Sequence, residues 1–452
     1  MKALKIGITG VRGIVGETFT PELVIAFAQA VGTYLGGGRI LVCRDTRPSG
    51  PMVRSAVMAG LIATGCEAID LGVCPTPSMQ LAVKRLNAAG GVSITAGHNP
   101  SPWNALKFVR GDGLYLNTRQ AEELLDIFYQ GEFEKAKWNE IQTHIEAQDA
   151  IEHHIEVLKS AFDVEAIRAR KLTVAVDCCN GACSVLSPRW LAELGCAVLA
   201  INDDIAAPFP HDPEPKRETM AQLRAIVKAG RADIGFAHDA DGERLGVVME
   251  TGEPLSEEMT LALATDIKLS RTPGVVVTNI STTQTIEKIA ARYDSNVIRV
   301  PVGAAYVSEA ILEHNAVIGG EGNGAVAIPE IHAATDSAAA IGLILEQMAR
   351  TGKPVSELVA NLPRYTMLKY YVQIEPNLLY SALQNARDES ERAGAADIDL
   401  SDGVKLAWPD GWVHIRASNT ESMIRIIAEA ESEARAKELL HWARDQIKKG
   451  YA

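Results

Sequence analysis

The segment RILVCRDTRPSGPMVRSAVMAGLIATGCEAIDL, residues 39–71, contains the pattern that decides the fold of this chain. It opens with an apolar run at residues 39–43, continues through a helix-like stretch at 52–64, and ends with a second apolar run to Leu71. A strand, a helix and a second strand in this order are typical of a parallel α/β unit, because parallel neighbours need a crossover connection. The segment therefore predicts an α/β sheet covered by helices on both faces.

The same order of elements recurs twice further along the chain. Residues 172–200 read as a strand, a helix and a second strand, and residues 274–300 repeat that pattern. Residues 369–452 differ, because alternating apolar patches are followed there by one helix-like stretch at 431–448. We therefore predict three related α/β domains with mixed or parallel sheets and a smaller C-terminal α+β domain.

The length of the chain agrees with several domains. At 452 residues it is too long for one core, since a domain usually holds roughly 100 to 200 residues. Proline and charged residues punctuate the pattern near Ala150, Pro254 and Pro363. We expect domains at residues 1–155, 156–255, 256–368 and 369–452.

Composition narrows the range of partners. With 44 basic and 57 acidic side chains the formal net charge is -13, which argues against a nucleic-acid backbone. Anionic small molecules are still compatible, because a local cluster of arginines can dominate the field in a cleft. No window of about twenty residues is continuously apolar, so no transmembrane helix and no membrane partner are expected. The start, MKALKI, lacks the apolar core of a signal peptide, and we expect a cytoplasmic protein.

Cysteine and histidine form no metal-binding pattern in the sequence. The seven cysteines have no paired spacing of the kind that zinc sites use, and most stand beside apolar runs, so buried thiols are expected. His153 and His154 lie in a polar, helix-like stretch, and we predict a solvent-exposed face there rather than a metal site.

An acidic segment follows the apolar run at residues 234–237. Residues 239–244, DADGER, carry carboxylates at alternate positions, Asp239, Asp241 and Glu243. Ligands of α/β sheets bind beyond the carboxyl ends of strands, and alternate residues of an extended segment point the same way. Three oxygen donors around one point suit Mg²⁺ better than Zn²⁺. An acidic turn in solvent has the same spacing, so the spacing alone leaves both interpretations open.

A glycine-dense segment, GGEGNG at residues 319–324, follows another apolar run. Glycine lets the backbone pass close to a ligand while Glu321 and Asn323 project from it. A carboxylate and an amide are natural partners of sugar hydroxyls. Glycine turns without a ligand are also common, so the segment is weak evidence by itself.

The segment RASNTE, residues 416–421, precedes an apolar run that carries Arg425. Its guanidinium, hydroxyl and backbone N–H groups are the donors that a phosphate dianion needs. The alternative is a helix or turn cap, since these side chains also bond to local backbone groups. The two arginines together favour phosphate. The donors proposed for it are Arg416, Ser418, Asn419, Thr420 and Arg425.

Residues 95–108, TAGHNPSPWNALKF, resemble the active-site loop of the α-D-phosphohexomutases. In that family a serine that carries a phosphoryl group stands directly before His-Asn-Pro, and Gly97 occupies that position here. The N-terminal segment GITGVRGIVG, residues 7–16, and the three segments described above also resemble family motifs, in the family's order. Each motif is common alone, but the ordered set is specific and covers nearly the whole chain.

The resemblance implies four domains around a central cleft and a Mg²⁺-dependent mutase. Such an enzyme moves phosphate between the 1 and 6 positions of a hexose or hexosamine through a bisphosphate, so sugar phosphates and hexose bisphosphate are the implied ligands. The resemblance implies that the acidic segment binds the metal ion and that Glu321 and Asn323 contact the sugar. Its implied catalytic positions are Gly97, His98, Lys107, Arg12 and Arg244.

Three positions depart from the family pattern. Glu243 replaces an aspartate, Asn323 replaces a serine, and Gly97 replaces the phosphorylated serine. Because Gly97 has no side chain to phosphorylate, we expect an impaired mutase. The alternatives are a catalytically silent homologue that binds sugar phosphates as a regulator, and a phosphatase or an enzyme with another phosphoryl acceptor. The motifs look most like the phosphoglucosamine mutase branch, with glucose and mannose phosphates also open.

Overall fold

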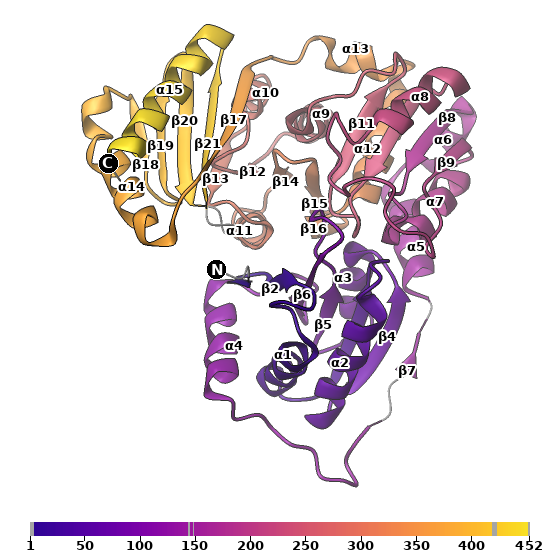
Figure 1. Ribbon diagram of the computed structural model, residues 1–452. Helices are drawn as coiled ribbons and strands as arrows, with labels where there is room; N and C mark the ends of the chain where they lie inside the picture. The colour runs from indigo at the N-terminus through magenta and orange to yellow at the C-terminus, as the bar shows by residue number, and fades with distance from the viewer. Residues whose placement is uncertain (1–3, 143–144, 148, 418–422, 451–452) are drawn as a thin grey trace.

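The computed structural model describes residues 4–142, 145–147, 149–417 and 423–450, which form four sheets with their helices (Figure 1). The three N-terminal sheets are mixed, and the fourth is antiparallel. The chain therefore has the predicted architecture of three α/β units followed by a smaller α+β unit.

The first sheet has the strand order β1-β2-β6-β5-β3-β4-β7. The apolar run predicted at residues 39–43 forms β3, which is parallel to β4 and β5, whereas β6 lies antiparallel beside β5. Thr20 caps α1 by accepting a hydrogen bond from Leu23 N, and Asn117 caps α4 with a capping box. The strands are β1 Lys5–Gly7, β2 Gly10–Ile14, β3 Arg39–Arg44, β4 Glu67–Val73, β5 Gly90–Ile94, β6 Trp103–Arg110 and β7 Ile145–Glu146. The helices are α1 Pro21–Tyr34, α2 Gly50–Ala63, α3 Thr76–Arg85 and α4 Thr118–Gln130.

The second sheet, in the order β11-β10-β8-β9, ends in an antiparallel strand pair. The acidic segment is the turn that joins these two strands, β10 and β11. The strands are β8 Thr173–Asp177, β9 Ala197–Ile201, β10 Ile234–His238 and β11 Leu245–Met249. The helices are α5 Ala150–Ala161, α6 Val164–Arg170, α7 Ser187–Glu193 and α8 Ala221–Gly230.

The third sheet, in the order β13-β12-β14-β15-β16, places the glycine-dense segment at the tight turn between β14 and β15. Its strands are β12 Val276–Asn279, β13 Val297–Val300, β14 Ile318–Glu321, β15 Ala325–Ile328 and β16 His332–Thr335. The helices are α9 Glu257–Leu269, α10 Thr285–Ala291, α11 Ala304–Glu313, α12 Ser337–Thr351 and α13 Val355–Ala360.

The fourth sheet is fully antiparallel in the order β17-β21-β20-β19-β18. Its strands are β17 Thr366–Gln373, β18 Asp397–Asp399, β19 Val404–Trp408, β20 Gly411–Ala417 and β21 Met423–Ala430. Helices α14, Pro376–Asp388, and α15, Glu433–Lys449, pack against it.

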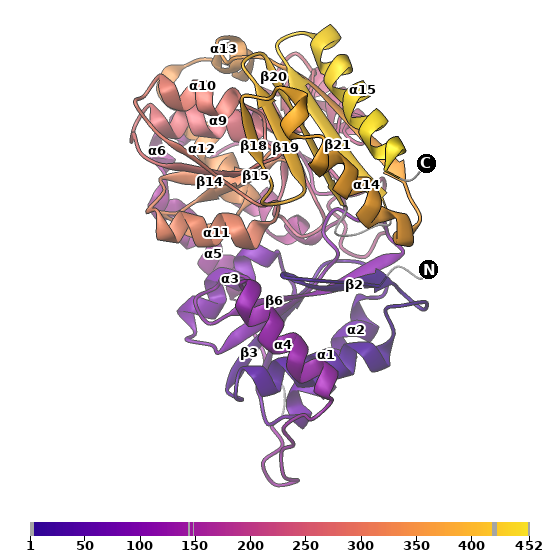
Figure 2. The same cartoon turned by 90° about the vertical axis from the view of Figure 1, so that its left-hand side faces the viewer.

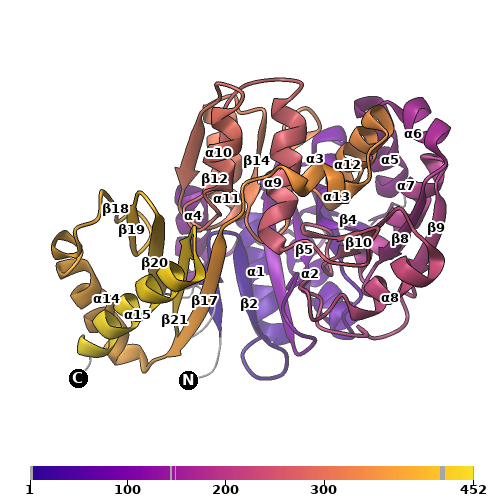
Figure 3. The same ribbon diagram turned by 90° about the horizontal axis from the view of Figure 1, so that it is seen from above.

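The second, third and fourth units form an arc above the first one. Figures 1 and 2 show the first sheet and its helices below the others, and Figure 3 shows the third unit between the second and the fourth. One apolar core joins the first three sheets through buried side chains such as Leu41, Trp190 and Ile318. The fourth sheet has a separate core that includes Ile415 and Ile426.

Polar contacts join the fourth unit to the third. Lys405 Nζ donates to Ile280 O at 2.6 Å, and Ser281 Oγ hydrogen-bonds His414 Nδ1 at 2.8 Å. Gln284 N donates to the Glu429 carboxylate at 2.9 Å. These bonds hold the three central strands of the fourth sheet beside the loop that follows β12.

Two local predictions are wrong. The single helix predicted between the two strands of residues 172–200 divides into a 3₁₀ turn, Ala182–Val185, and helix α7, because Pro188 in the first turn of α7 offers no N–H to continue the turn before it. His154 is fully buried rather than solvent-exposed. Since α5 packs against α3 and α12, the imidazole hydrogen-bonds Ser78 at 2.8 Å and Asp336 at 2.9 Å.

The cysteines agree with expectation in the described part of the chain. Six of the seven cysteines are buried thiols, and Cys196 is half-buried. None of the helices there is long and apolar enough to cross a bilayer.

Candidate active site

A cavity of about 660 Å³ lies where the four units meet. Each of the four units contributes residues to its wall. Among these residues are Gly97, Arg244, Glu321 and Arg416. A second cavity of about 390 Å³ adjoins it. The residues that line both are His98, Arg244, Val302, Asn323, Arg416 and Arg425.

The loop after β5 is held from behind by Arg47, whose side chain is fully buried. Its guanidinium donates to the carbonyl oxygens of Gly97 at 2.7 Å, Asn99 at 2.7 Å and Pro100 at 2.9 Å. The charge of Arg47 is balanced by Asp45 at 2.9 Å. All three contacts to the loop are to backbone atoms, so these bonds do not depend on the side chains at these positions.

Gly97 has a φ of +54°, in the left-handed region where glycine is favoured. Its N–H donates to Thr95 Oγ1 at 2.9 Å. A Cβ atom built at this position would lie 3.4 Å from Asp241 Oδ1 and 3.7 Å from Lys107 Nζ, which is ordinary van der Waals contact. A side chain at residue 97 would therefore fit, and it would start beside a carboxylate and an ammonium group.

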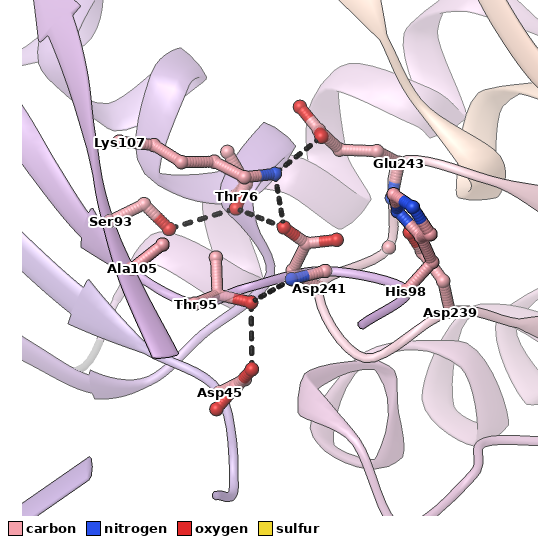
Figure 4. A network of polar contacts seen from close by, with 12 residues as sticks. Asp45, Thr76, Ser93, Thr95, His98, Ala105, Lys107, Asp239, Asp241 and Glu243 are labelled. Carbon is pink, nitrogen blue, oxygen red and sulfur yellow. Dashed lines mark hydrogen bonds and ion pairs between the residues drawn. The ribbon is translucent and has the colours of Figure 1, made fainter. Parts of the chain in front are cut away.

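Lys107, on β6, lies between two carboxylates of the acidic segment (Figure 4). Its Nζ is 2.6 Å from Asp241 Oδ2 and 2.6 Å from Glu243 Oε2. Tyr115 donates its hydroxyl proton to the other oxygen of Glu243 at 2.5 Å. Burial alone would lower the pKa of Lys107, but the two carboxylates raise it above its ordinary value. The cluster is thus a partly buried ammonium group with two negative neighbours.

The acidic segment fits a cation only in part. Asp239 Oδ1 accepts the N–H groups of Glu243 and Arg244, and burial together with Asp241 raises the pKa of Asp239. Asp241 Oδ1 is buried without a hydrogen-bond donor among the described residues, as a metal-ligating oxygen would be. Glu243 turns instead to Lys107 and Tyr115. Across the described ranges, no three His, Cys, Asp or Glu side chains are arranged to hold one metal ion.

Three cationic side chains gather around His98, which is half-buried. Arg244 Nη2 lies 3.5 Å from His98 Nε2, and Arg12 donates to the Asn99 carboxamide at 3.1 Å. Burial lowers the pKa of His98 well below its ordinary value, and the charges of Arg244, Arg12 and Lys107 lower it further. The imidazole is therefore neutral at physiological pH.

Glu321 ends β14 with its carboxylate at the cavity wall. Oε1 accepts hydrogen bonds from Asn279 Nδ2 at 2.7 Å and Gly303 N at 3.0 Å. Asn323 donates to the other oxygen at 3.4 Å, so both predicted sugar contacts lie together. Gly322 is required between them, because a Cβ there would lie 1.9 Å from the Glu258 carboxylate.

Arg416 and Arg425 stand directly opposite each other on the neighbouring strands β20 and β21. Opposed residues of an antiparallel pair project from the same face of the sheet, and like charges there repel unless an anion lies between them. Asp402 accepts from Arg416 Nε at 2.9 Å and from Val302 N at 3.1 Å, which ties the pair to the third unit. The predicted donors Ser418, Asn419 and Thr420 lie outside the described residues.

Several residues of this site carry no signal in the sequence. Tyr115 and Asn279 lie outside every motif, yet they fix the carboxylates of Glu243 and Glu321. Asp402 is likewise isolated in the sequence from Arg416 and Val302. Glu214 holds Arg244 at 2.9 Å and lines the second cavity. Only the fold brings these residues to the motifs.

Comparison with known proteins identifies the family. Models of the phosphoglucomutase/phosphomannomutase α/β/α domains I, II and III match residues 3–135, 152–252 and 256–365, and the C-terminal domain model matches residues 378–446. The chain is 40% identical to a phosphoglucomutase/phosphomannomutase of Thermococcus kodakarensis, over 96% of each chain. It is 37% identical to a probable phosphoglucosamine mutase of Methanopyrus kandleri, over 96% of this chain and 95% of that one.

Solved structures give the same result. A phosphoglucomutase/phosphomannomutase family protein from Burkholderia thailandensis superposes with a TM-score of 0.84 at 26% identity, covering 100% of this chain and 98% of the other. A putative phosphomannomutase from Thermus thermophilus also has a TM-score of 0.84 at 26% identity, with 99% and 100% covered. This chain therefore belongs to the phosphoglucomutase/phosphomannomutase family of α-D-phosphohexomutases, a family of isomerases that transfer phosphate, as its motifs predict.

Proposed function

We propose that the cleft binds a hexose or hexosamine phosphate and its bisphosphate, and that mutase turnover between the 1- and 6-phosphates is weak because of Gly97. The observation that carries this proposal is the opposed pair Arg416 and Arg425, which faces the same cavity as Glu321 and the loop of Gly97. Two guanidinium groups on one face suit a phosphate dianion. With Glu321 at the sugar hydroxyls, the other end of a sugar phosphate would reach the loop of Gly97.

Each group has a role in the mutase reaction. Lys107 and Arg12 would attract the phosphoryl group to be transferred, and Glu321 with Asn323 would orient the sugar. Mg²⁺, if held by Asp239 and Asp241, would neutralise charge on the transferred phosphoryl group. Glu243 would have to leave Lys107 to join them. The missing element is the hydroxyl that accepts the phosphoryl group.

The substrate class is no narrower than hexose or hexosamine phosphates. The relatives carry names that include phosphoglucomutase, phosphomannomutase and phosphoglucosamine mutase. The polar groups at Glu321 and Asn323 suit hydroxyl groups common to these sugars.

A catalytically silent sugar-phosphate-binding protein is the second candidate. The position of Lys107 favours this candidate. Its ammonium group lies between Asp241 and Glu243 and balances the negative charge of these carboxylates, as a metal ion otherwise would. Under this alternative the cleft keeps its ligand, and its occupancy serves regulation instead of turnover.

Ligand binding tests the shared part of the two candidates. We expect hexose 6-phosphates to raise the melting temperature and to compete with one another for one site in calorimetry. If they do neither, the family membership is one of fold alone.

Metal binding distinguishes the candidates. The mutase proposal expects Asp241→Asn to weaken Mg²⁺ binding strongly in calorimetry, with Asp388→Asn as a control on an exposed carboxylate. Equal Mg²⁺ affinity of the native protein and Asp241→Asn would contradict metal binding by the acidic segment. No Mg²⁺ binding in the native protein, together with retained sugar-phosphate binding, would favour the silent protein.

A further inference from the structure

Gly97 leaves phosphoryl transfer without its acceptor, and three side chains of the same loop are chemically able to replace it: Thr95, His98 and Ser101. Thr95 is fully buried, with its hydroxyl donating to Asp45 at 2.7 Å and accepting from Gly97 N at 2.9 Å. Ser101 is exposed and lines neither cavity. Only His98 of the three lies at the wall of the cleft.

His98 lies where the two cavities meet, since its side chain lines both. The backbone on either side of it is fixed, because Arg47 donates to the carbonyl oxygens of Gly97 and Asn99, each at 2.7 Å. A side chain on a loop held in this way keeps one orientation relative to a bound phosphate, and phosphoryl transfer requires such a fixed geometry. Position and rigidity therefore suit His98 to a direct contact with the ligand.

The charges around His98 suit a phosphoryl acceptor. Arg244 lies 3.5 Å from the imidazole, and Arg12 is bound to the neighbouring Asn99. Guanidinium groups stabilise a phosphoryl group during transfer and the dianion that it forms afterwards. Because these cations disfavour an imidazolium, one ring nitrogen keeps its lone pair and needs no general base to become a nucleophile.

We propose that His98 accepts a phosphoryl group from a hexose 1,6-bisphosphate bound in the cleft. The lone pair of an imidazole nitrogen forms an N–P bond while the P–O ester bond to the sugar breaks. The sugar oxygen takes up a proton, and the other ring nitrogen loses one, so that the products are a hexose monophosphate and a phosphohistidine with a neutral ring and a dianionic phosphoryl group. Transfer of this phosphoryl group to the free 6-hydroxyl of a bound hexose 1-phosphate re-forms the bisphosphate, and loss of its 1-phosphoryl group to His98 after reorientation completes a slow mutase cycle.

This inference rests on the proposed binding of sugar phosphates, and its experiment reads binding and transfer separately. The native protein is incubated with ³²P-labelled glucose 1,6-bisphosphate, and the label that remains on the protein is followed through acid and alkali. Phosphohistidine is lost in acid and survives alkali, whereas phosphoserine and phosphothreonine behave in the opposite way. The melting temperature with unlabelled bisphosphate reports binding in the same samples.

The expected result is an acid-labile, alkali-stable label that peptide mapping assigns to His98. His98→Gln should lose at least about tenfold of the label, which is the loss of the nucleophile, while its melting temperature still rises with bisphosphate. His314→Gln, which alters an exposed histidine, should keep the label. Mapping on the native protein retains the test if His98→Gln does not fold.

Absence of label while bisphosphate raises the melting temperature would overturn the role of His98 and leave the binding site intact. An acid-stable label would also overturn it, because a hydroxyl would then be the acceptor. Absence of both label and melting shift would overturn this inference and the proposed function together.

Discussion

The loop at Gly97 and the loop at Glu321 face one cavity, but the fold holds them in different ways. Arg47 fixes the first loop through the carbonyl oxygens of Gly97, Asn99 and Pro100. The second loop is held in part through the side chain of Glu321, whose carboxylate accepts from Asn279 and Gly303. The side chain at residue 97 can therefore be lost without loss of the bonds from Arg47, whereas Glu321 combines support of its loop with its proposed contact to the sugar.

This difference explains how the loop can keep its shape with no side chain at residue 97. Backbone-held positions tolerate a change of side chain, because no support bond is removed. The acidic segment combines both kinds of support. The Asp239 carboxylate accepts from the backbone N–H groups of Glu243 and Arg244, whereas the side chain of Glu243 contacts Lys107. The account predicts that support and chemistry can be disturbed independently on the Gly97 side of the cavity.

The largest effect is expected from removal of the backbone support. Arg47→Met should lower the free energy of unfolding by about 3–5 kcal/mol, because Asp45 would be left as a buried charge without its partner. Chemical denaturation followed by fluorescence measures it. Arg39→Met is the control, since it breaks an exposed ion pair with Glu67 that is worth about 0–1 kcal/mol. Equal stability of the two variants would contradict the role given to Arg47.

The second effect is a pH dependence beneath the Glu321 loop. Burial raises the pKa of Glu258 to about 7 from 4.5, against the opposing charge of Lys369. The folded state therefore prefers the protonated carboxyl, so this contribution to stability is full below about pH 4.5 and is lost as the pH rises through 7. Relative to Glu258→Gln, the native protein should lose up to about 3 kcal/mol across that window. A constant difference between the two proteins from pH 4.5 to 7.5 would refute the raised pKa.

The third effect concerns Arg416 and Arg425, the proposed phosphate-binding pair. Arg425→Ala should weaken binding of hexose 6-phosphate by about ten- to a hundredfold, since a charge-assisted hydrogen bond contributes ~1.5–3 kcal/mol. Arg444→Ala is a matched control, because both arginines lie over a tyrosine ring of β17 but Arg444 lines neither cavity. Calorimetry compares the two variants. Equal affinities of the two variants for hexose 6-phosphate would contradict a phosphate contact with Arg425 on the fourth sheet.

The smallest effect is on stability at Gly97 itself. Gly97→Ala should cost only ~1–2 kcal/mol, because a side chain at φ +54° is strained but meets no clash. Thermal unfolding of this variant beside Arg47→Met compares the two kinds of change directly. A loss as large as that of Arg47→Met would mean that the loop depends on the glycine.

Much of the fold was predictable, because it depends on local patterns. The alternating strands and helices of the first three units follow from apolar runs such as residues 39–43, and the family motifs follow from short ordered segments. The candidate site residues in the described ranges, except Asp241, line one cavity, while their chemical roles stay predictions.

What could not be predicted depends on packing between distant segments. The exposure of His154 is decided by the packing of α5 on α3 and α12, which no property of α5 alone specifies. The opposition of Arg416 and Arg425 is a matter of strand register, and the turn of Glu243 towards Lys107 and Tyr115 joins elements more than 100 residues apart.

The most direct test of the central claim is a coupled assay of hexose 1-phosphate to 6-phosphate conversion, with Mg²⁺ and bisphosphate, on the native protein and Gly97→Ser. The account predicts weak turnover in the native protein and a rise of about a hundredfold or more in the variant, because the serine oxygen would start beside Asp241 and Lys107 in a loop whose support is intact. Full activity of the native protein, unchanged by the serine, would contradict it.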